Sequence, residues 1–158
     1  MRIRPAVFIL ACTIAAVACG AAITTSPSQT AGSLRLTARI SQALIASNGT
    51  ATITFVLENS GSDTVNLTFS DSCQISPYIA RSSGPVVYPE GGSWMCATVV
   101  THLSLPPHAS KTVDLQLRAA AQASYPYVAL APGQYSAYAT VKSDLASLKS
   151  DPVVFTVQ

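Results

Sequence analysis

Four cysteines, two histidines and seven carboxylates are the residues of this 158-residue chain that could support chemistry. Cys12 lies inside an apolar N-terminal run, and Cys19 directly follows that run. Cys73 and Cys96 remain in the body of the chain, and in an exported protein such a pair predicts a structural disulfide. Closing a loop of this size should add roughly 3 kcal/mol to the free energy of unfolding.

Two other uses of the cysteines have less support in the sequence. A metal site needs about four ligands, and the only imidazoles are those of His102 and His108. A redox pair normally takes the form C-x-x-C, which is absent from the sequence. We therefore expect no metal and no cofactor.

No nucleophile and base occur together in a known catalytic arrangement. His102 lies in an alternating run, His108 follows two prolines, and no G-x-S-x-G motif is present. The carboxylates are scattered, and Asp63 and Asp71 adjoin turns, where aspartate usually bonds the local backbone. These observations predict that the protein is not an enzyme. A small hydrolase is the alternative, although it lacks a nucleophile–base pair.

The N-terminal segment has the pattern of a secretory signal peptide. Arg2 and Arg4 precede an apolar run from Ala6 to Ala18 that ends in small residues. A charged start, an apolar run of about 7–15 residues and a small-residue cleavage site define such peptides. The run is short for a transmembrane helix, which needs ~20 residues. We predict that residues 1–18 are a signal peptide, with an uncleaved anchor as the alternative.

Ala16-Val17-Ala18-Cys19 resembles the bacterial lipobox, in which small and aliphatic residues precede a cysteine. The resemblance implies that Cys19 becomes the lipidated first residue of an exported, membrane-anchored protein. Plain cleavage after Ala18 is the alternative, and it would leave Cys19 as an odd thiol in a secreted or periplasmic protein. Residues 19–33 carry no charge and are rich in Ser, Thr, Ala and Gly, which predicts a flexible tether.

Charge is scarce in this chain and balanced after the signal peptide. Charged residues make up 10% of the sequence, against about 25% in typical globular proteins. Because Arg2 and Arg4 are two of the nine basic residues, seven basic and seven acidic residues follow the expected signal peptide. The composition argues against a disordered tail and against a nucleic-acid partner, since both need many charges.

Most of the chain after residue 33 shows the two-residue alternation of half-buried strands. Apolar residues occupy the even positions of Leu34–Ile40 and one face of Thr52–Leu57. Thr64–Phe69 alternates again after the turn cluster Asn59–Asp63, so the last two runs predict a β-hairpin. Seven to nine short strands without a helical period predict an all-β sandwich or barrel over residues 34–158. The remaining strands are expected at residues 78–80, 86–88, 96–105, 112–118, 135–141 and 153–157.

A six-residue motif near the C-terminal end predicts a tyrosine corner. Leu130-Ala131-Pro132-Gly133-Gln134-Tyr135 fits the pattern L-x-P-G-x-Y. In such a corner, a tyrosine near the start of a strand donates its hydroxyl hydrogen to upstream backbone. We expect Leu130, Pro132, Gly133 and Tyr135 to define this connection.

The order of strands and turns is similar to that of the BsuPI-type domain, the intracellular proteinase inhibitor family. The similarity covers about residues 50–142. It implies an immunoglobulin-like antiparallel β-sandwich and inhibition of serine proteases, and no inhibitory residue is carried over from it. The segments that carry it are Thr52–Gly61, Val65–Asp71, a strand containing Tyr78, a Gly-Pro turn, Val86–Tyr88, Leu103–Pro107 and Pro132–Tyr135.

Loops on a rigid scaffold carry most binding residues, and the segment Pro89–Met95 is the best candidate here. Trp94 is either a binding anchor or a side chain packed over the disulfide or the edge of the core. Met95 follows it and precedes Cys96. Tyr125–Tyr127 is a further candidate surface.

Two hypotheses of function follow from these features. The first is an exported, lipid-anchored β-sandwich that serves as a binding module of the cell envelope and has no catalytic activity. The alternative, from the family resemblance, is a protein inhibitor of serine proteases. Both require a protein partner, either an envelope component or a protease. The membrane is a further expected partner, through a lipid on Cys19.

Overall fold

The computed structural model describes residues 24–25, 29–122 and 125–158. The predicted signal peptide and Cys19 lie outside this part of the chain. Within it, no helix is both long and apolar enough to cross a membrane. The one helical turn among the described residues is η1 (Glu90–Gly92), and strands form the rest of the regular structure.

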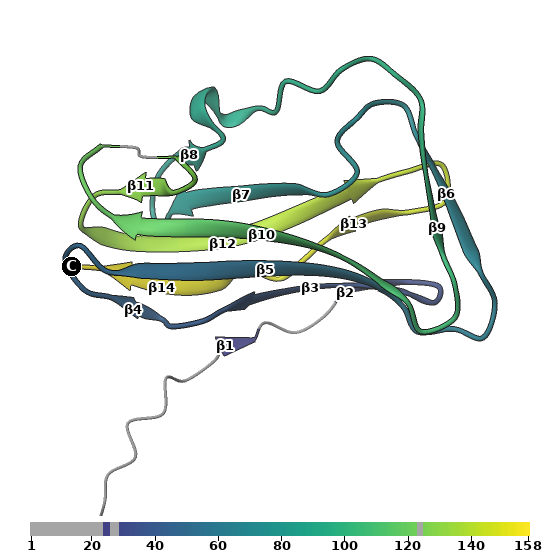
Figure 1. Cartoon of the computed structure of the whole chain (residues 1–158), viewed down its shortest axis with the longest axis horizontal. Helices are drawn as coiled ribbons and strands as arrows, with labels where there is room; N and C mark the ends of the chain where they lie inside the picture. Colours follow the sequence, from purple (N-terminus) through teal and green to yellow (C-terminus); the bar gives the residue numbers. More distant parts are fainter. Residues whose placement is uncertain (1–23, 26–28, 123–124) are drawn as a thin grey trace, which may run out of the picture.

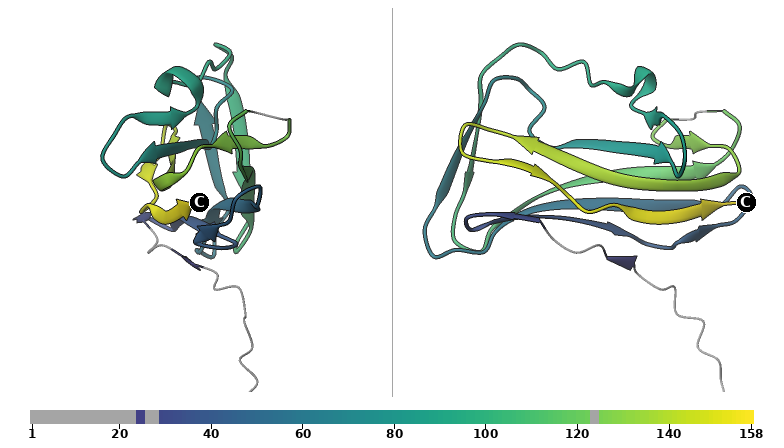
Figure 2. Two further views of the ribbon diagram at one scale, coloured as in Figure 1. Left: turned by 90° about the vertical axis from the view of Figure 1, so that its left-hand side faces the viewer. Right: turned by 180° about the vertical axis from the view of Figure 1, so that it is seen from behind.

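Two six-stranded sheets form the body of the molecule, and Figure 2 (left) shows them along their strands. The first sheet has the order β1-β3-β5-β10-β11, with β2 beside β3. Its strands are β1 (Thr24–Thr25), β2 (Gln29–Ala31), β3 (Leu34–Ile40), β5 (Thr50–Asn59), β10 (Ser110–Ala119) and β11 (Val128–Leu130).

The second sheet has the order β4-β14-β12-β7-β8, with β13 beside β12. Pairing is antiparallel in both sheets except for β10 with β11 and β14 with β4. The strands of the second sheet are β4 (Leu44–Ile45), β7 (Ser76–Arg81), β8 (Val86–Tyr88), β12 (Gly133–Lys142), β13 (Ser147–Lys149) and β14 (Val153–Val157).

A third, two-stranded sheet stands at one end of the sandwich (Figure 1). It pairs β6 (Val65–Phe69) with β9 (Thr101–Leu105) in an antiparallel register that sets Leu67 opposite Leu103. Leu67 and Phe69 are buried, so this small sheet contributes to the same core as the two larger ones.

Alternation along the strands builds the core as the sequence predicts. Every second residue of β5 is buried from Ala51 to Asn59, while the residues between them are half-buried or at the surface. β12 buries Tyr135, Ala137, Ala139 and Val141 in the same way. Because successive side chains of a strand point to opposite faces, these patterns turn one face of each sheet inward. The predicted all-β sandwich is confirmed, and the described residues contain one disulfide, between Cys73 and Cys96.

The described residues form the strands β1 to β14, which is more than the seven to nine expected. Several of these strands are only two or three residues long and were not expected from the sequence. The sandwich also begins before Leu34. β2 pairs with β3 through a turn at Gly32, whose φ of 61° favours glycine. Part of the interval 19–33, expected to be a tether, is therefore paired in the first sheet.

The predicted hairpin of Thr52–Leu57 with Thr64–Phe69 is wrong. β5 has β3 on one side and β10 on the other, so no free edge is left for β6. β6 instead pairs with β9, which lies far along the chain. Residues 96–100, expected to belong to a strand, lie outside β9 and form a loop.

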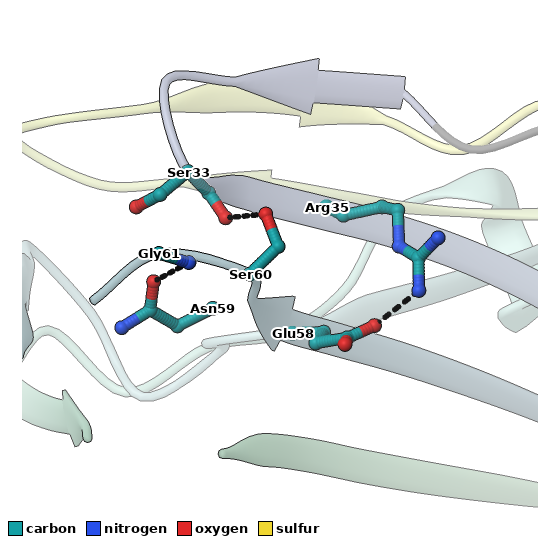
Figure 3. A network of polar contacts seen from close by, with 6 residues as sticks. All are labelled: Ser33, Arg35, Glu58, Asn59, Ser60 and Gly61. Carbon is teal, nitrogen blue, oxygen red and sulfur yellow. Dashed lines mark hydrogen bonds and ion pairs between the residues drawn. The ribbon is translucent and has the colours of Figure 1, made fainter. Parts of the chain in front are cut away.

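The buried side chain of Asn59 turns the chain out of the first sheet. Its Oδ1 accepts a hydrogen bond from the N–H of Gly61 at 3.0 Å, a contact that Figure 3 shows. Its Nδ2 donates to the carbonyl oxygens of Asp63 at 2.7 Å and Leu105 at 3.0 Å. One amide thus ties the turn after β5 to the end of β9, which places β6 beside β9.

The tyrosine-corner motif spans the end of β11 and the start of β12. The hydroxyl of Tyr135 donates to the carbonyl oxygen of Ala131 at 2.8 Å, four residues upstream. The buried Tyr135 ring stacks on Phe155 at a centroid distance of 5.6 Å. Leu130 is buried and Pro132 is exposed. This contact fixes the start of β12 against the core.

Candidate functional site

The segment 89–100, here called the contact loop, connects β8 to β9. Figures 1 and 2 show it running along the outside of the sandwich from η1 to the third sheet. It contains the candidates Pro89, Trp94 and Met95 and the cysteine Cys96. After η1 it has no strand or helix, so its conformation depends on contacts with neighbouring elements.

A tight turn begins the contact loop. Pro89 is buried, and its carbonyl accepts a hydrogen bond from Gly92 N–H at 2.9 Å. Gly91 and Gly92 have φ values of 73° and 75°, a region that residues with a Cβ rarely adopt. Ser93 then returns to an extended conformation, with φ of −136° and ψ of 139°. The two glycines therefore set the direction in which the rest of the loop leaves β8.

Trp94 is the first anchor of the contact loop. Its indole N–H donates to the carbonyl oxygen of Pro77 at 2.8 Å, on β7. Its ring meets the ring of Tyr88 edge to face, with centroids 5.4 Å apart. Of the two roles considered for Trp94, packing against the edge of the core is the one these contacts satisfy. The indole fixes the loop to the second sheet.

The disulfide is the second anchor, and the predicted pairing of Cys73 with Cys96 is confirmed, with a Cα–Cα distance of 5.6 Å. Backbone and side-chain bonds reinforce it on both sides. Ser72 N–H donates to Ala97 O at 3.1 Å, and Ala97 N–H donates to Ser72 Oγ at 3.0 Å. Asp71 Oδ1 accepts from Cys73 N–H at 2.8 Å. The loop is thus tied to the segment after β6.

Met95 lies between these two anchors and is fully exposed, at 100%. In the described residues, neither its backbone N–H nor its carbonyl has a hydrogen-bond partner. Val99 and Val100 further along the loop are also exposed, at 50% and 61%. A free apolar side chain and a free peptide group are therefore presented by a segment whose neighbours on both sides are fixed.

Two hollows adjoin the base of the contact loop, and Cys73 and Trp94 line both of them. One has a volume of about 280 Å³ and polar lining residues that include Asp71 and Lys142. The other, of about 390 Å³, is more apolar and includes Tyr88. Met95 lines neither, so it projects beyond the hollows.

Asp71, Cys73 and Cys96 bring a carboxylate oxygen and two sulfur atoms within 4.8 Å of one another. Both sulfurs are consumed by the disulfide, and a metal-binding cysteine must be a thiolate. In its oxidised form this group offers a single carboxylate, which also accepts the Cys73 N–H. In this arrangement the three residues hold the contact loop in place.

The other candidates from the sequence lie apart from a common site. His102 is exposed on β9, with Nδ1 3.4 Å from Thr68 Oγ1. His108 is exposed in the turn before β10, with a φ of 59°. Tyr125 is 99% exposed, next to residues 123–124, which are outside the described part. Of these candidate surfaces, only the contact loop is held on both sides by described contacts.

Tyr88 provides a way to observe the base of the loop. Burial raises the pKa of its hydroxyl above the usual value near 10. Because the folded-state pKa is the higher one, the neutral phenol stabilises the fold below about pH 10, and this contribution is lost as the pH rises through the folded pKa.

The titration of Tyr88 is obtained by subtracting the phenolate absorbance of the Tyr88→Phe variant from that of the native chain at each pH. We expect the midpoint of this difference to lie above that of an exposed tyrosine. Trp94 is the only tryptophan in the chain, so its emission should change over the same pH range. A midpoint at or below the usual tyrosine value would contradict the packing of Tyr88 against Trp94.

The sequence was compared with the models of known protein families. The family described as "BsuPI: Intracellular proteinase inhibitor" matches residues 38–145, more than half of the chain. The chain belongs to the BsuPI family. As BsuPI is a family of inhibitors, its description favours a protein partner, a protease, over a catalytic role. No curated protein matches this BsuPI chain closely enough in sequence to count as a relative.

Solved structures resemble this BsuPI chain only distantly. The Pseudomonas fluorescens DNA glycosylase AlkC matches at 13% identity and a TM-score of 0.40, over 88% of this chain and 31% of that one. The β-glucosidase EmGH1 of Erythrobacter marinus matches at 12% and 0.42, over 87% and 15%. The CARDB domain of the Pyrococcus furiosus PF1109 protein matches at 16% and 0.42, over 73% and 80%. The chain spans under a third of the first two proteins, and these similarities carry no functional argument.

Proposed function

We propose that this chain inhibits a protease by binding it through the contact loop. The observation that supports the proposal is the position of Met95, fully exposed between the disulfide and the anchored Trp94. Protease inhibitors bind tightly with little backbone movement. A loop that is already fixed loses little conformational entropy on binding, so more of its contact energy appears as affinity.

The proposal is tested by titrating the whole chain against a subtilisin-like and a trypsin-like protease, at enzyme concentrations high enough to show stoichiometry. We expect activity of the subtilisin-like enzyme to fall linearly to an equivalence point near one chain per enzyme. Full activity of both enzymes at large excess of intact chain would overturn the proposal.

We also propose that the protein is exported and anchored by a lipid on Cys19. Support comes from the basic and apolar pattern of residues 1–18, from Ala16-Val17-Ala18-Cys19, and from the disulfide, which is typical of oxidising compartments. The intact mass of protein extracted from membranes should correspond to a chain that begins at an acylated Cys19. The mass of an unmodified chain that begins at Cys19 would contradict the anchor and leave plain secretion.

An envelope binding module remains the second candidate function. The observation in its favour is that exposed apolar side chains continue from Met95 to Val99 and Val100, further than a single protease specificity pocket requires. If the titration shows no inhibition, chemical crosslinking in intact envelopes should recover one specific partner. Recovery of no specific partner would contradict this candidate.

A further inference from the structure

The side chain of Met95 identifies the class of protease that this loop fits. Resting on the proposed function, we infer that Met95 enters the primary specificity pocket of a serine protease whose pocket is apolar, as in subtilisin-like or chymotrypsin-like enzymes.

The chemistry of the contact loop excludes one common class of target. Residues 89–100 include no Lys or Arg, and Glu90 is their only charged residue. A trypsin-like pocket ends in a carboxylate and requires a basic side chain, whereas a chymotrypsin-like pocket is a hydrophobic slot. Methionine is unbranched, flexible and apolar, so its side chain fits such a slot without clashing at the Cβ.

The backbone around Met95 is free to bind as a substrate does. Extended peptides are recognised by main-chain hydrogen bonds that add a short strand to a protein surface. The N–H and carbonyl of Met95 have no partner among the described residues, and Ser93 is already extended. These groups can therefore form hydrogen bonds with a protease, and no hydrogen bond inside the chain has to break first.

Such a protease would attack the peptide bond between Met95 and Cys96, and the disulfide holds the residue directly after this bond. The protease serine attacks the Met95 carbonyl, the C–N bond to Cys96 breaks, and the new amine takes a proton. Water then releases Met95 as a carboxylate. Cys96 stays bonded to Cys73, and Trp94 stays bound to Pro77. Because both new ends are held in place, religation competes with release, which keeps the enzyme occupied.

The inference is tested with Met95→Lys and Met95→Leu in the full chain, each titrated against a subtilisin-like and a trypsin-like protease. Met95→Lys should weaken inhibition of the subtilisin-like enzyme by at least about 30-fold, the effect of losing an interface anchor, and should gain inhibition of trypsin. Met95→Leu should retain inhibition within about tenfold. Leu44→Lys is the matched control, because Leu44 is also exposed, at 53%, but lies on β4 outside the loop.

The possible results separate the inference from the proposed function. Inhibition by the native chain that Met95→Lys leaves unchanged would overturn the role of Met95 and leave the inhibitor function standing. Absence of inhibition by the native chain would overturn both. On long incubation with a trace of protease, we expect a fragment that begins at Cys96 and separates only after reduction. A first cut at another bond of the contact loop would overturn the assignment.

Discussion

Replacing both Cys73 and Cys96 by serine should lower the free energy of unfolding by roughly 3 kcal/mol and abolish inhibition by the chain. The loss of stability follows from the larger conformational entropy of the unfolded chain when a loop of this length is no longer closed. The loss of inhibition has a separate cause, since the disulfide is the anchor on the C-terminal side of Met95. Without it, ordering the loop on binding would cost affinity.

Denaturant unfolding followed by Trp94 emission measures the first effect, and protease titration measures the second. The native chain treated with a reductant is the matched control, and it should behave like the double variant in both assays. If the double variant retained full inhibition while losing stability, the disulfide would support the fold but not the contact loop.

Replacing Asn59 by leucine should destabilise the protein by about 3 kcal/mol, with no direct effect on the residues of the contact loop. Asn59 is fully buried and donates to the carbonyl oxygens of Asp63 and Leu105. Leucine has a similar volume but no polar group, so these carbonyls and the Gly61 N–H would lose their partners. Each buried polar group left without a partner costs about 1–3 kcal/mol.

Ser60→Ala is the control for this change, because Ser60 is the exposed neighbour of Asn59 and its hydroxyl donates one bond, to Ser33 O at 2.8 Å (Figure 3). We expect it to cost no more than about 1 kcal/mol. Urea unfolding of both variants measures the difference. Equal, small losses would mean that the Asn59 amide does not fix the turn between β5 and β6.

The sequence allowed the strands, the disulfide and the family to be predicted because each depends on a short-range or compositional signal. Alternation in Leu34–Ile40 and Thr52–Leu57 identified faces that are buried in the structure. Cys73 and Cys96 were the pair left after the N-terminal cysteines were assigned to an export segment. Such signals are read from neighbouring residues or from the composition of the chain, and they need no knowledge of the fold.

Strand pairing could not be predicted in the same way. Alternation shows that Thr64–Phe69 is a strand, but it does not show which partner the strand takes. The partner depends on which sheet edges are already occupied, and β5 is covered on both sides. Residues 96–100 show a related limit: their apolar and β-branched side chains suggested a strand, yet the disulfide and the Ser72–Ala97 bonds hold them in a loop.

The candidate loop was predicted from its position and its tryptophan, but its geometry was not. Nothing in the sequence shows that the Trp94 indole bonds Pro77, more than a dozen residues away, or that Met95 is left exposed. The order Trp-Met-Cys does contain a usable signal. Successive side chains of an extended segment point to opposite sides, so a residue between two that are fixed to the scaffold points away from it.

Binding of a protease through the contact loop is tested most directly by hydrogen exchange. Exchange is measured in the chain alone and with one equivalent of a subtilisin-like protease whose catalytic serine is replaced by alanine. Amides without hydrogen bonds exchange quickly, and the Met95 N–H has no partner in the described residues. We expect fast exchange across residues 93–96 in the free chain and strong protection there in the complex. Protection confined to the outer faces of the sheets, with the contact loop unchanged, would contradict this mode of binding.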